Sequence, residues 1–590
     1  MRARKGRCLE TTGNRAEAEA PLVWALAHLD SASEVSRGDI YFARMALGRI
    51  RYTQTNYAAA RSEFSAALPL ATAETRRDPL IWFARSGVFE DQSEALARAD
   101  EALALVAQAA QAGQAGQEGR RNTAAVRTVR ARILLNQGNH GAANSALLRA
   151  LGEQGGLDRS VNASDIATRS DLAISAILLG NPTQAQRYLA FTGAGQLGAS
   201  PFGGGGSIAP PPCGSETGLQ PDDMAIVEFG IGLNGAVAYA TTVYLSRPSD
   251  VGAAAFAEAV RNWSWRHEDV AGIEPLLRAV TRVELRCSTA SQGLDVYAII
   301  NAELDRWLAG QSARPFDTTG NPTAILAAAN TELESRRAAG RGADVLAPLM
   351  AIADNPLTDE VKKVATLTEA LSILETLSAP VAARVAIETR LLAAVADSPR
   401  DHDYLRGLRR LLARNDVEAD ALSSAVLKLS LAERVDVGER VELLSAIAND
   451  TRLPATDPLK VAALVRLANL QAAAGQVEAA RASYAQTGLE AQQCALVDAR
   501  PSMQRSGASS SDYPLEAQRW GFEGWARVEF DIRGDGRTAN RRAVIVYPPL
   551  VFRHASVGII EDARFTQTFR PDGNLGCGGA SQTIRFNLPE

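Results

Sequence analysis

The sequence has few of the residues that build metal sites. Among 590 residues there are five cysteines and five histidines. No two cysteines form a Cys-x-x-Cys pair, and the histidines are scattered singly, so the usual zinc-binding spacings are missing. We therefore expect neither a metal nor another cofactor.

Motifs for catalysis and nucleotide binding are also missing. The sequence has no Gly-x-Ser-x-Gly, no His-Glu-x-x-His and no Walker A motif. Four consecutive glycines at 203–206 are followed by no Gly-Lys-Ser/Thr, so they favour a linker over a phosphate loop. We expect the protein not to be an enzyme.

Excess charge and long apolar runs are lacking too. The formal net charge is −5, which gives no basic surface for nucleic acid. No apolar run approaches the ~18 residues of a membrane helix. The first residues, MRARKGRCLE, are basic but lack the apolar segment of a signal peptide. Either the protein is cytoplasmic, or an export signal lies upstream of this start.

Most of the chain has the pattern of paired helices. Hydrophobic residues make up 46% of it, which is enough for globular cores, and its length predicts about three or four units. Leu47, Gly48, Ala60, Phe64 and Ala67 resemble a tetratricopeptide repeat, in which small residues let two antiparallel helices approach closely. Weaker copies follow at 138–150, 180–189 and 467–484. The alternative is a general array of helical hairpins, and both interpretations predict an α-solenoid.

Two short segments have the alternating pattern of strands instead. The segment 191–215 is rich in glycine and proline, which ends the helical pattern. After it, residues 225–231 alternate as a strand, and Asn234-Gly235 predicts a hairpin turn. A helical face at 253–263 and a short strand at 281–287 follow. The order strand, strand, helix, strand recurs at 526–588.

The two β segments align at a constant offset of 301 residues, which indicates an internal duplication. At this offset, Val227 corresponds to Val528. The same offset relates further pairs of similar residues along both segments, over a longer stretch than a shared β composition would explain. The further pairs are Phe229 with Phe530, Ile231 with Ile532, Gly235 with Gly536, Val243 with Val544 and Val283 with Ile584.

The sequence therefore predicts an α+β multidomain protein in which tetratricopeptide-like solenoids alternate with two small β-β-α-β modules. The predicted units are a helical region at 1–192, a Gly/Pro linker at 193–215, a first module at 216–290, a second helical region at 291–490 and a second module at 494–590.

The second module resembles the C-terminal domain of TonB over about residues 511–590, and the first is a divergent copy. The residues that carry the resemblance are Tyr513-Pro514, Ala517, Glu523-Gly524, Val528, Phe530, Ile532, Asp535-Gly536, Asn540, Val544, Phe552, Ala555 and Arg564-Phe565. The first copy lacks Tyr-Pro and has Trp263-Ser264-Trp265 in place of the Arg-Phe region.

This resemblance implies a periplasmic protein, exported by an upstream signal, that captures a partner peptide as an added strand. A free sheet edge is a template for such a strand. The partner is a protein or peptide, such as an outer-membrane receptor segment. The implied peptide-binding residues are Tyr513, Pro514, Ile584, Arg585, Phe586 and Asn587.

Two alternatives to peptide capture remain open at this point. The solenoid could cover the sheet edge, so that nothing else binds there. The chain could instead be a component of TonB-type energy coupling, although it lacks the membrane helix and the long Pro/Lys-rich span of that family. Binding or scaffolding is the safer inference.

The module boundaries predict one disulfide in each module. Cys213 and Cys287 flank the first module, and Cys494 and Cys577 are placed similarly in the second. Four cysteines allow three connectivities, so this choice rests on the boundaries alone. Cys8 is expected to be free.

Overall fold

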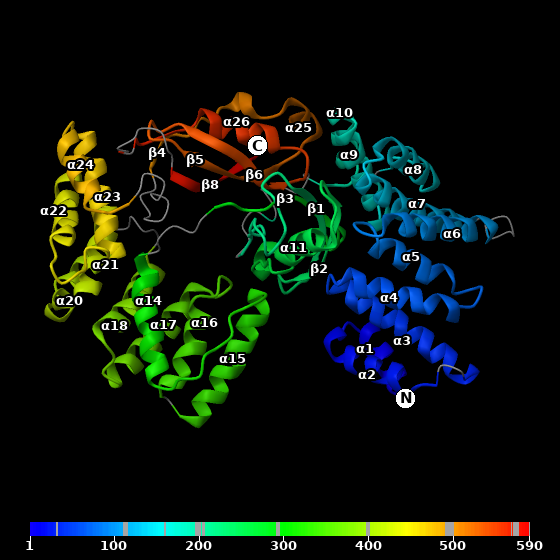
Figure 1. The fold of residues 1–590 in the computed structure, drawn as a ribbon, viewed down its shortest axis with the longest axis horizontal. Coiled ribbons are helices and arrows are strands. Elements are labelled where there is room, and N and C mark those ends of the chain that lie inside the picture. Colours follow the sequence, from blue (N-terminus) through cyan, green and yellow to red (C-terminus); the bar gives the residue numbers. More distant parts are fainter. Residues whose placement is uncertain are drawn as a thin grey trace.

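The computed structural model describes residues 1–30, 33–109, 116–158, 161–194, 202, 207–290, 296–340, 342–396, 402–489, 501–567, 569 and 577–588. Two helical arrays flank a central β-sheet, as Figure 1 shows, with the amino-terminal array on one side and the second array on the other. The α+β class predicted from the sequence is confirmed at this level.

The first array consists of paired helices joined by short turns. Gly138, Gly180 and Gly475 (the last in the second array) have φ of 79°, 77° and 78°, a conformation that glycine adopts readily at a helix end. The helices are α1 (Arg2–Thr11), α2 (Arg15–His28), α3 (Glu34–Thr53), α4 (Tyr57–Ala67), η1 (Leu68–Leu70), α5 (Arg77–Ser86), α6 (Gln92–Ala109), α7 (Gln117–Asn136), α8 (His140–Glu153), α9 (Ala163–Leu178) and α10 (Pro182–Ala190).

The predicted close approach of α3 and α4 is present. A Cβ atom on Gly48 would lie 2.5 Å from the Phe64 ring, so only glycine fits there. Phe64 itself is fully buried. The pair thus packs as the small-residue pattern predicts.

The second array has its own packed cores and includes the turn at Gly475. Its helices are α14 (Val296–Gly310), α15 (Pro322–Ala339), η3 (Ala343–Val345), α16 (Leu346–Ala353), α17 (Glu360–Thr376), α18 (Val381–Val395), α19 (His402–Leu412), α20 (Asn415–Ala419), α21 (Ala421–Ala432), α22 (Val437–Ala448), α23 (Pro458–Ala473) and α24 (Val477–Ala485).

The two modules have the predicted element order with additions. The first contains β1 (Met224–Ile231), β2 (Val237–Leu245), α11 (Asp250–Arg261), α12 (His267–Ala271), α13 (Pro275–Ala279) and β3 (Thr281–Arg286). The second contains β4 (Met503–Arg505), η5 (Ser510–Asp512), α25 (Leu515–Trp520), β5 (Gly524–Ile532), β6 (Thr538–Tyr547), α26 (Arg553–Asp562), β7 (Arg564–Phe565) and β8 (Cys577–Phe586).

The hairpins of the two modules share one register except near the turn, where Gly230 lies opposite Tyr239 but its counterpart Asp531 lies opposite Ala539. Ile226 lies opposite Tyr244, and Arg527 lies opposite Ile545, each beside a bulge at the same position. The turn glycine repeats as well, because a Cβ on Gly235 or on Gly536 would lie 1.9 or 2.1 Å from a carbonyl oxygen of the chain that follows the helix.

The last strand departs from the predicted offset. Val227 lies opposite Val283, whereas Val528 lies opposite Gln582, so the counterpart of Val283 is Gln582 and the pairing with Ile584 is wrong. The chain between helix and last strand differs in the two modules, with α12 and α13 in one and β7 in the other, and this shifts the strand by two residues.

The modules are joined in one six-stranded sheet of order β2-β1-β3-β6-β5-β8. The junction is antiparallel, with Glu284 opposite Val546 and Leu285 opposite Ile545. In this sheet, each strand of the second module therefore runs in the opposite direction to its counterpart in the first, and this places the two module helices on opposite faces of the sheet. Phe229 packs with Phe256 of α11 in one core, and Phe530 packs with Ile559 of α26 in the other.

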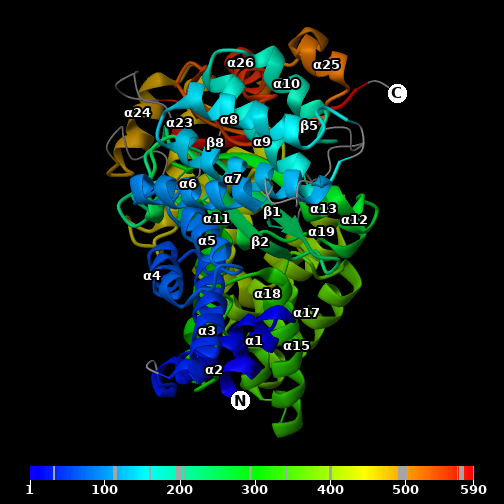
Figure 2. The same cartoon turned by 90° about the vertical axis from the view of Figure 1, so that its right-hand side faces the viewer.

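The amino-terminal array shares both of these cores. Residues of α7 to α10 pack in the core beside α26, and residues of α4 to α7 pack in the core beside α11. Figure 2 shows α6 to α9 crossing in front of the sheet. The second array instead has separate cores of its own.

The described part of the predicted linker is packed against both modules. Phe202 is 4% exposed. The Trp263 indole donates to the carbonyl of Ala209, and Arg527 donates to that of Ile208. Phe202 and Ile208 are therefore buried, whereas Ala209, Pro212, Gly214 and Ser215 of the same segment are exposed.

The first predicted disulfide is confirmed. Cys213 and Cys287 are bonded, with their Cα atoms 4.9 Å apart. Cys8 is exposed and unpaired, as expected. Cys494 and the side chain of Cys577 lie outside the described residues, so the second disulfide stays a prediction.

Candidate strand-addition site

The final strand lies at one end of the sheet. Within the described part of the chain, β8 pairs with β5 alone, and Ile584, Arg585 and Phe586 lie opposite Ala526, Trp525 and Gly524. The strand spans Cys577–Phe586 rather than the predicted 583–588, so Asn587 follows its last residue. Both Arg585 and Asn587 are exposed.

Of the predicted binding residues, Phe586 lies in the core and the partly buried Tyr513 packs against it. Phe586 is 4% exposed and stacks on Phe552, with ring centroids 4.3 Å apart. The Tyr513 ring packs edge-on against both, and its hydroxyl donates to the Phe522 carbonyl. Burial, with a smaller effect of Glu523, raises the pKa of Tyr513 to about 12. These rings hold the end of β8 in place.

The remaining predicted residues have simpler positions. Pro514 precedes α25, where its fixed φ suits a helix start. Ile584 is half-buried against the core beside α26. Arg585 is thus the predicted side chain that projects from the strand itself into solvent.

At the other end of the sheet, β2 is closed by a side chain of α7. The Asn136 amide donates to the Val243 carbonyl at 3.1 Å, and its oxygen accepts from the Leu245 N–H at 2.9 Å. Those are the two backbone groups that a neighbouring strand would use. Asn136 is 5% exposed, so water does not compete for them.

The third candidate edge, that of β3, is occupied by β6. Beyond the two paired residues, Arg286 donates to the Ala543 carbonyl at 3.0 Å, and Glu284 accepts from the Leu550 N–H at 3.0 Å. Glu529 accepts from Ser288 and from the Thr289 N–H. The first module's last strand therefore already has a strand beside it.

A buried ionic cluster anchors the first array to the sheet. Asp171 of α9 accepts from Arg282 of β3 at 2.6 Å and from Arg132 of α7 at 2.7 Å. Arg282 also donates to Glu228 of β1 at 2.7 Å. Burial alone would raise the pKa of Glu228, but Arg282 and Arg132 outweigh it and lower that pKa.

Sequence reasoning missed both Asn136 and this cluster. Asn136 ends an ordinary helix, and nothing in its neighbours marks it. Glu228 carried a signal, because it aligns with Glu529 at the same offset of 301 and lies between apolar strand residues. A glutamate at the same position of two matching apolar strands indicates that each carboxylate pairs with a residue from another part of the fold.

Searches for membrane spans and metal clusters among the described residues gave none. No helix of this part of the chain is long and apolar enough to cross a bilayer. In the same residues, no group of three or more His, Cys, Asp or Glu side chains is arranged to hold a metal ion.

Comparisons with known proteins add little. No protein-family model matches the sequence. No curated protein matches it either. Among solved structures, it is similar to the apo form of RapI, at 9% identity over 82% of this chain and 95% of that chain, with a TM-score of 0.19. That score is too low to indicate a shared fold.

Proposed function

We propose that this chain is a non-enzymatic protein-binding scaffold that captures an extended segment of a partner by strand addition to β8. One observation carries the proposal. Of three candidate strand edges, β2 has the Val243 carbonyl and the Leu245 N–H bonded by Asn136, β3 is paired with β6, and β8 has neither a strand nor such a side chain from the described residues on its outer side. An uncovered edge offers backbone donors and acceptors to an added strand.

The proposed compartment is the periplasm, as the resemblance of residues 511–590 to the TonB C-terminal domain implies. The Cys213–Cys287 disulfide supports this, because disulfides persist in oxidising compartments such as the bacterial periplasm. The partner implied by the same resemblance is a segment of an outer-membrane receptor.

Proline substitutions in β8 test the proposal. Neighbouring residues of a strand point their N–H groups to opposite sides, so either Gln582→Pro or Thr583→Pro removes a donor from the outer edge. The other variant disrupts pairing with β5 and should lower the thermal unfolding temperature. We expect the variant that unfolds like the parent to lose capture of synthetic outer-membrane receptor segments in pull-downs with the full chain.

Alanine at the same two positions provides the matched control, since it keeps the N–H and should keep capture. A photo-crosslinker in place of Arg585 should label the bound segment, and one in place of the exposed Ala238 of β2 should not. Equal capture by both proline variants, or labelling only from Ala238, would refute strand addition at β8.

A further inference from the structure

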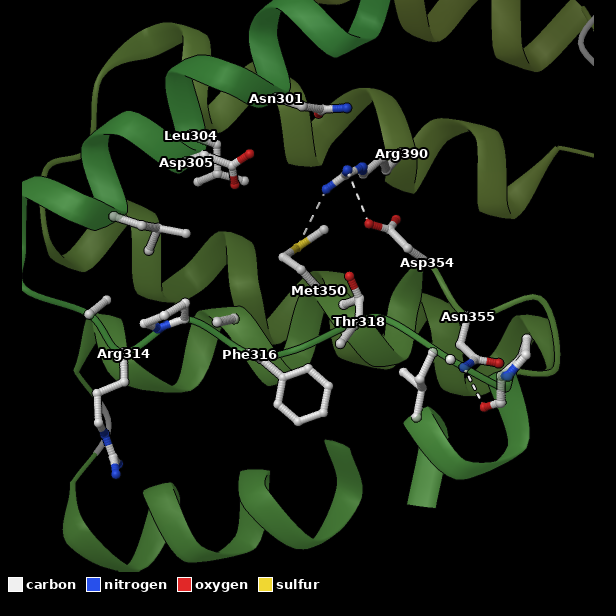
Figure 3. A pocket seen from close by; sticks show the side chains of 18 of the residues that line it. Asn301, Leu304, Asp305, Arg314, Phe316, Thr318, Met350, Asp354, Asn355 and Arg390 are labelled. Carbon is white, nitrogen blue, oxygen red and sulfur yellow. Dashed lines mark hydrogen bonds and ion pairs between the residues drawn. The ribbon is translucent and has the colours of Figure 1, made fainter. Parts of the chain in front are cut away.

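A cavity of about 800 Å³ is lined by the second helical array and by Ser207 of the segment before the first module. Helices α14 and α16, Arg390 of α18 and the segment 313–320 surround it, as Figure 3 shows. Its volume falls within the range of small-molecule sites, which are mostly apolar with a few placed polar groups.

One part of the wall is apolar. Leu304 and Leu308 of α14, Met350 of α16 and Phe316 of the crossing segment all line it. Leu304 is only 2% exposed, so this wall is backed by the core of the array. Such a surface suits an aliphatic or aromatic body.

The other part of the wall presents oxygen acceptors. The Oδ1 atom of Asn301 is buried and has no hydrogen-bond partner among the described residues. Asp305 lies one helical turn further along α14, and both side chains line the cavity. Because this oxygen has almost no accessible surface, the acceptor that a ligand in the cavity can reach is the exposed carboxylate of Asp305.

The charges at this wall are unbalanced. Asp354 pairs with Arg390 at 3.1 Å, which leaves the Asp305 carboxylate in excess. Partial burial raises the pKa of Asp354, and Asp305 acts in the same direction, while Arg390 and Lys363 oppose it. Arg314 does not correct the imbalance, because it is paired with Asp344 at 3.0 Å and points away from the cavity.

We infer that this cavity binds an organic cation, an amine or guanidinium carried on an apolar body. The cationic head donates to the carboxylate of Asp305 and lies near that of Asp354. The apolar body packs on Leu304 and Phe316. The head can belong to a small amine or to a basic side chain of a polypeptide, and the site is independent of the strand-addition edge.

Calorimetric titration of the full chain tests the inference with two pairs of probes. Hexylammonium is compared with hexanoate, and acetyl-Leu-Arg-Leu-amide is compared with the same peptide containing citrulline. We expect the cationic member of at least one pair to bind and its partner not to. Asp305→Asn should weaken that binding about tenfold, as for loss of a charged hydrogen bond.

Glu303→Gln is the matched control, because Glu303 is a carboxylate of the same helix that pairs with Arg306 and does not line the cavity. Binding should also weaken as the pH falls, since Asp354 takes up a proton at a higher pH than an ordinary aspartate. If the arginine peptide binds more tightly than hexylammonium, the cationic head belongs to a side chain of a polypeptide. If only hexylammonium binds, the ligand is a small amine.

Three results would overturn the inference. One is equal binding of cationic and non-cationic probes. Another is the absence of binding by either cation at millimolar concentration. The third is the same affinity for Asp305→Asn and the parent, with the variant shown to be folded by its thermal unfolding.

Discussion

A single amide decides whether one end of the sheet is open. The Asn136 side chain supplies one donor and one acceptor to β2, as the backbone of a neighbouring strand would. Its own position is held by a further hydrogen bond to the Arg132 carbonyl at 2.9 Å. Closure by a helix side chain protects this edge from pairing with other chains.

Asn136→Leu should therefore be destabilising. Leucine has a similar size but leaves the Val243 carbonyl and the Leu245 N–H buried without partners, at about 1–3 kcal/mol for each group. Urea unfolding should show the loss in the free energy of unfolding. Gln137→Leu, at the exposed neighbouring position, should change it little. Equal unfolding curves for the two variants would show that the amide does not close this edge.

At the scale of elements, the same module is used in two different settings. Glu228 and Glu529 occupy matching positions on the central strands β1 and β5. Glu228 binds Arg282 and lies 3.6 Å from Arg132 of the first array. Glu529 binds Arg542 and the chain that follows β3. A duplicated polar position has thus acquired a different neighbour in each copy.

The Glu228 contacts should make stability depend on pH. The pKa of Glu228 is lowered in the folded protein. Its carboxylate therefore contributes fully to the free energy of unfolding above the pKa of the unfolded chain, about 4.3, and this contribution is lost as the pH falls through the lower pKa of the folded state. At pH 7, Glu228→Gln should cost roughly 3 kcal/mol, because it leaves Arg282 less compensated.

Chemical unfolding at pH 7, 4 and 3 measures this effect. The difference between parent and Glu228→Gln should shrink toward low pH. Glu258→Gln, which alters an exposed pair with Arg261, should show a small difference at every pH. A difference for Glu228→Gln that stays constant from pH 7 to 3 would mean that the carboxylate charge is not what stabilises the cluster.

At the scale of the whole molecule, the cores do not follow the order of the chain. The first array and both modules share two cores, although residues 296–489 separate the modules in sequence. The second array keeps separate cores. We therefore expect two cooperative regions, one of them discontinuous in sequence.

Phe530→Ala should distinguish these regions. Loss of this buried ring costs about 3–5 kcal/mol and should affect everything that shares its core. Hydrogen exchange read by mass spectrometry should show faster exchange in β5, α26 and α8–α10, with α15–α18 unchanged. Ile387→Ala, in a core of the second array, should give the opposite pattern. Faster exchange throughout the chain in either variant would indicate one cooperative unit.

Features set by nearby residues could be predicted from the sequence. Helical periodicity, the small-residue contact of Gly48 with Phe64, and the turns at Gly235 and Gly536 all depend on a few residues and on backbone geometry. The duplication was visible because its offset holds through the hairpin. The Cys213–Cys287 bond followed from module boundaries, which bring these two ends together.

Only the tertiary structure decided which strand edge is left for a partner. The pairing of β3 with β6, the placement of α11 and α26 on opposite faces and the closure of β2 by Asn136 each join parts of the chain that are far apart in sequence. Local pattern determines which residues form a strand and which face is apolar. It does not determine what lies beside that strand, because the backbone groups of an edge are the same whether a strand, a side chain or a partner pairs with them.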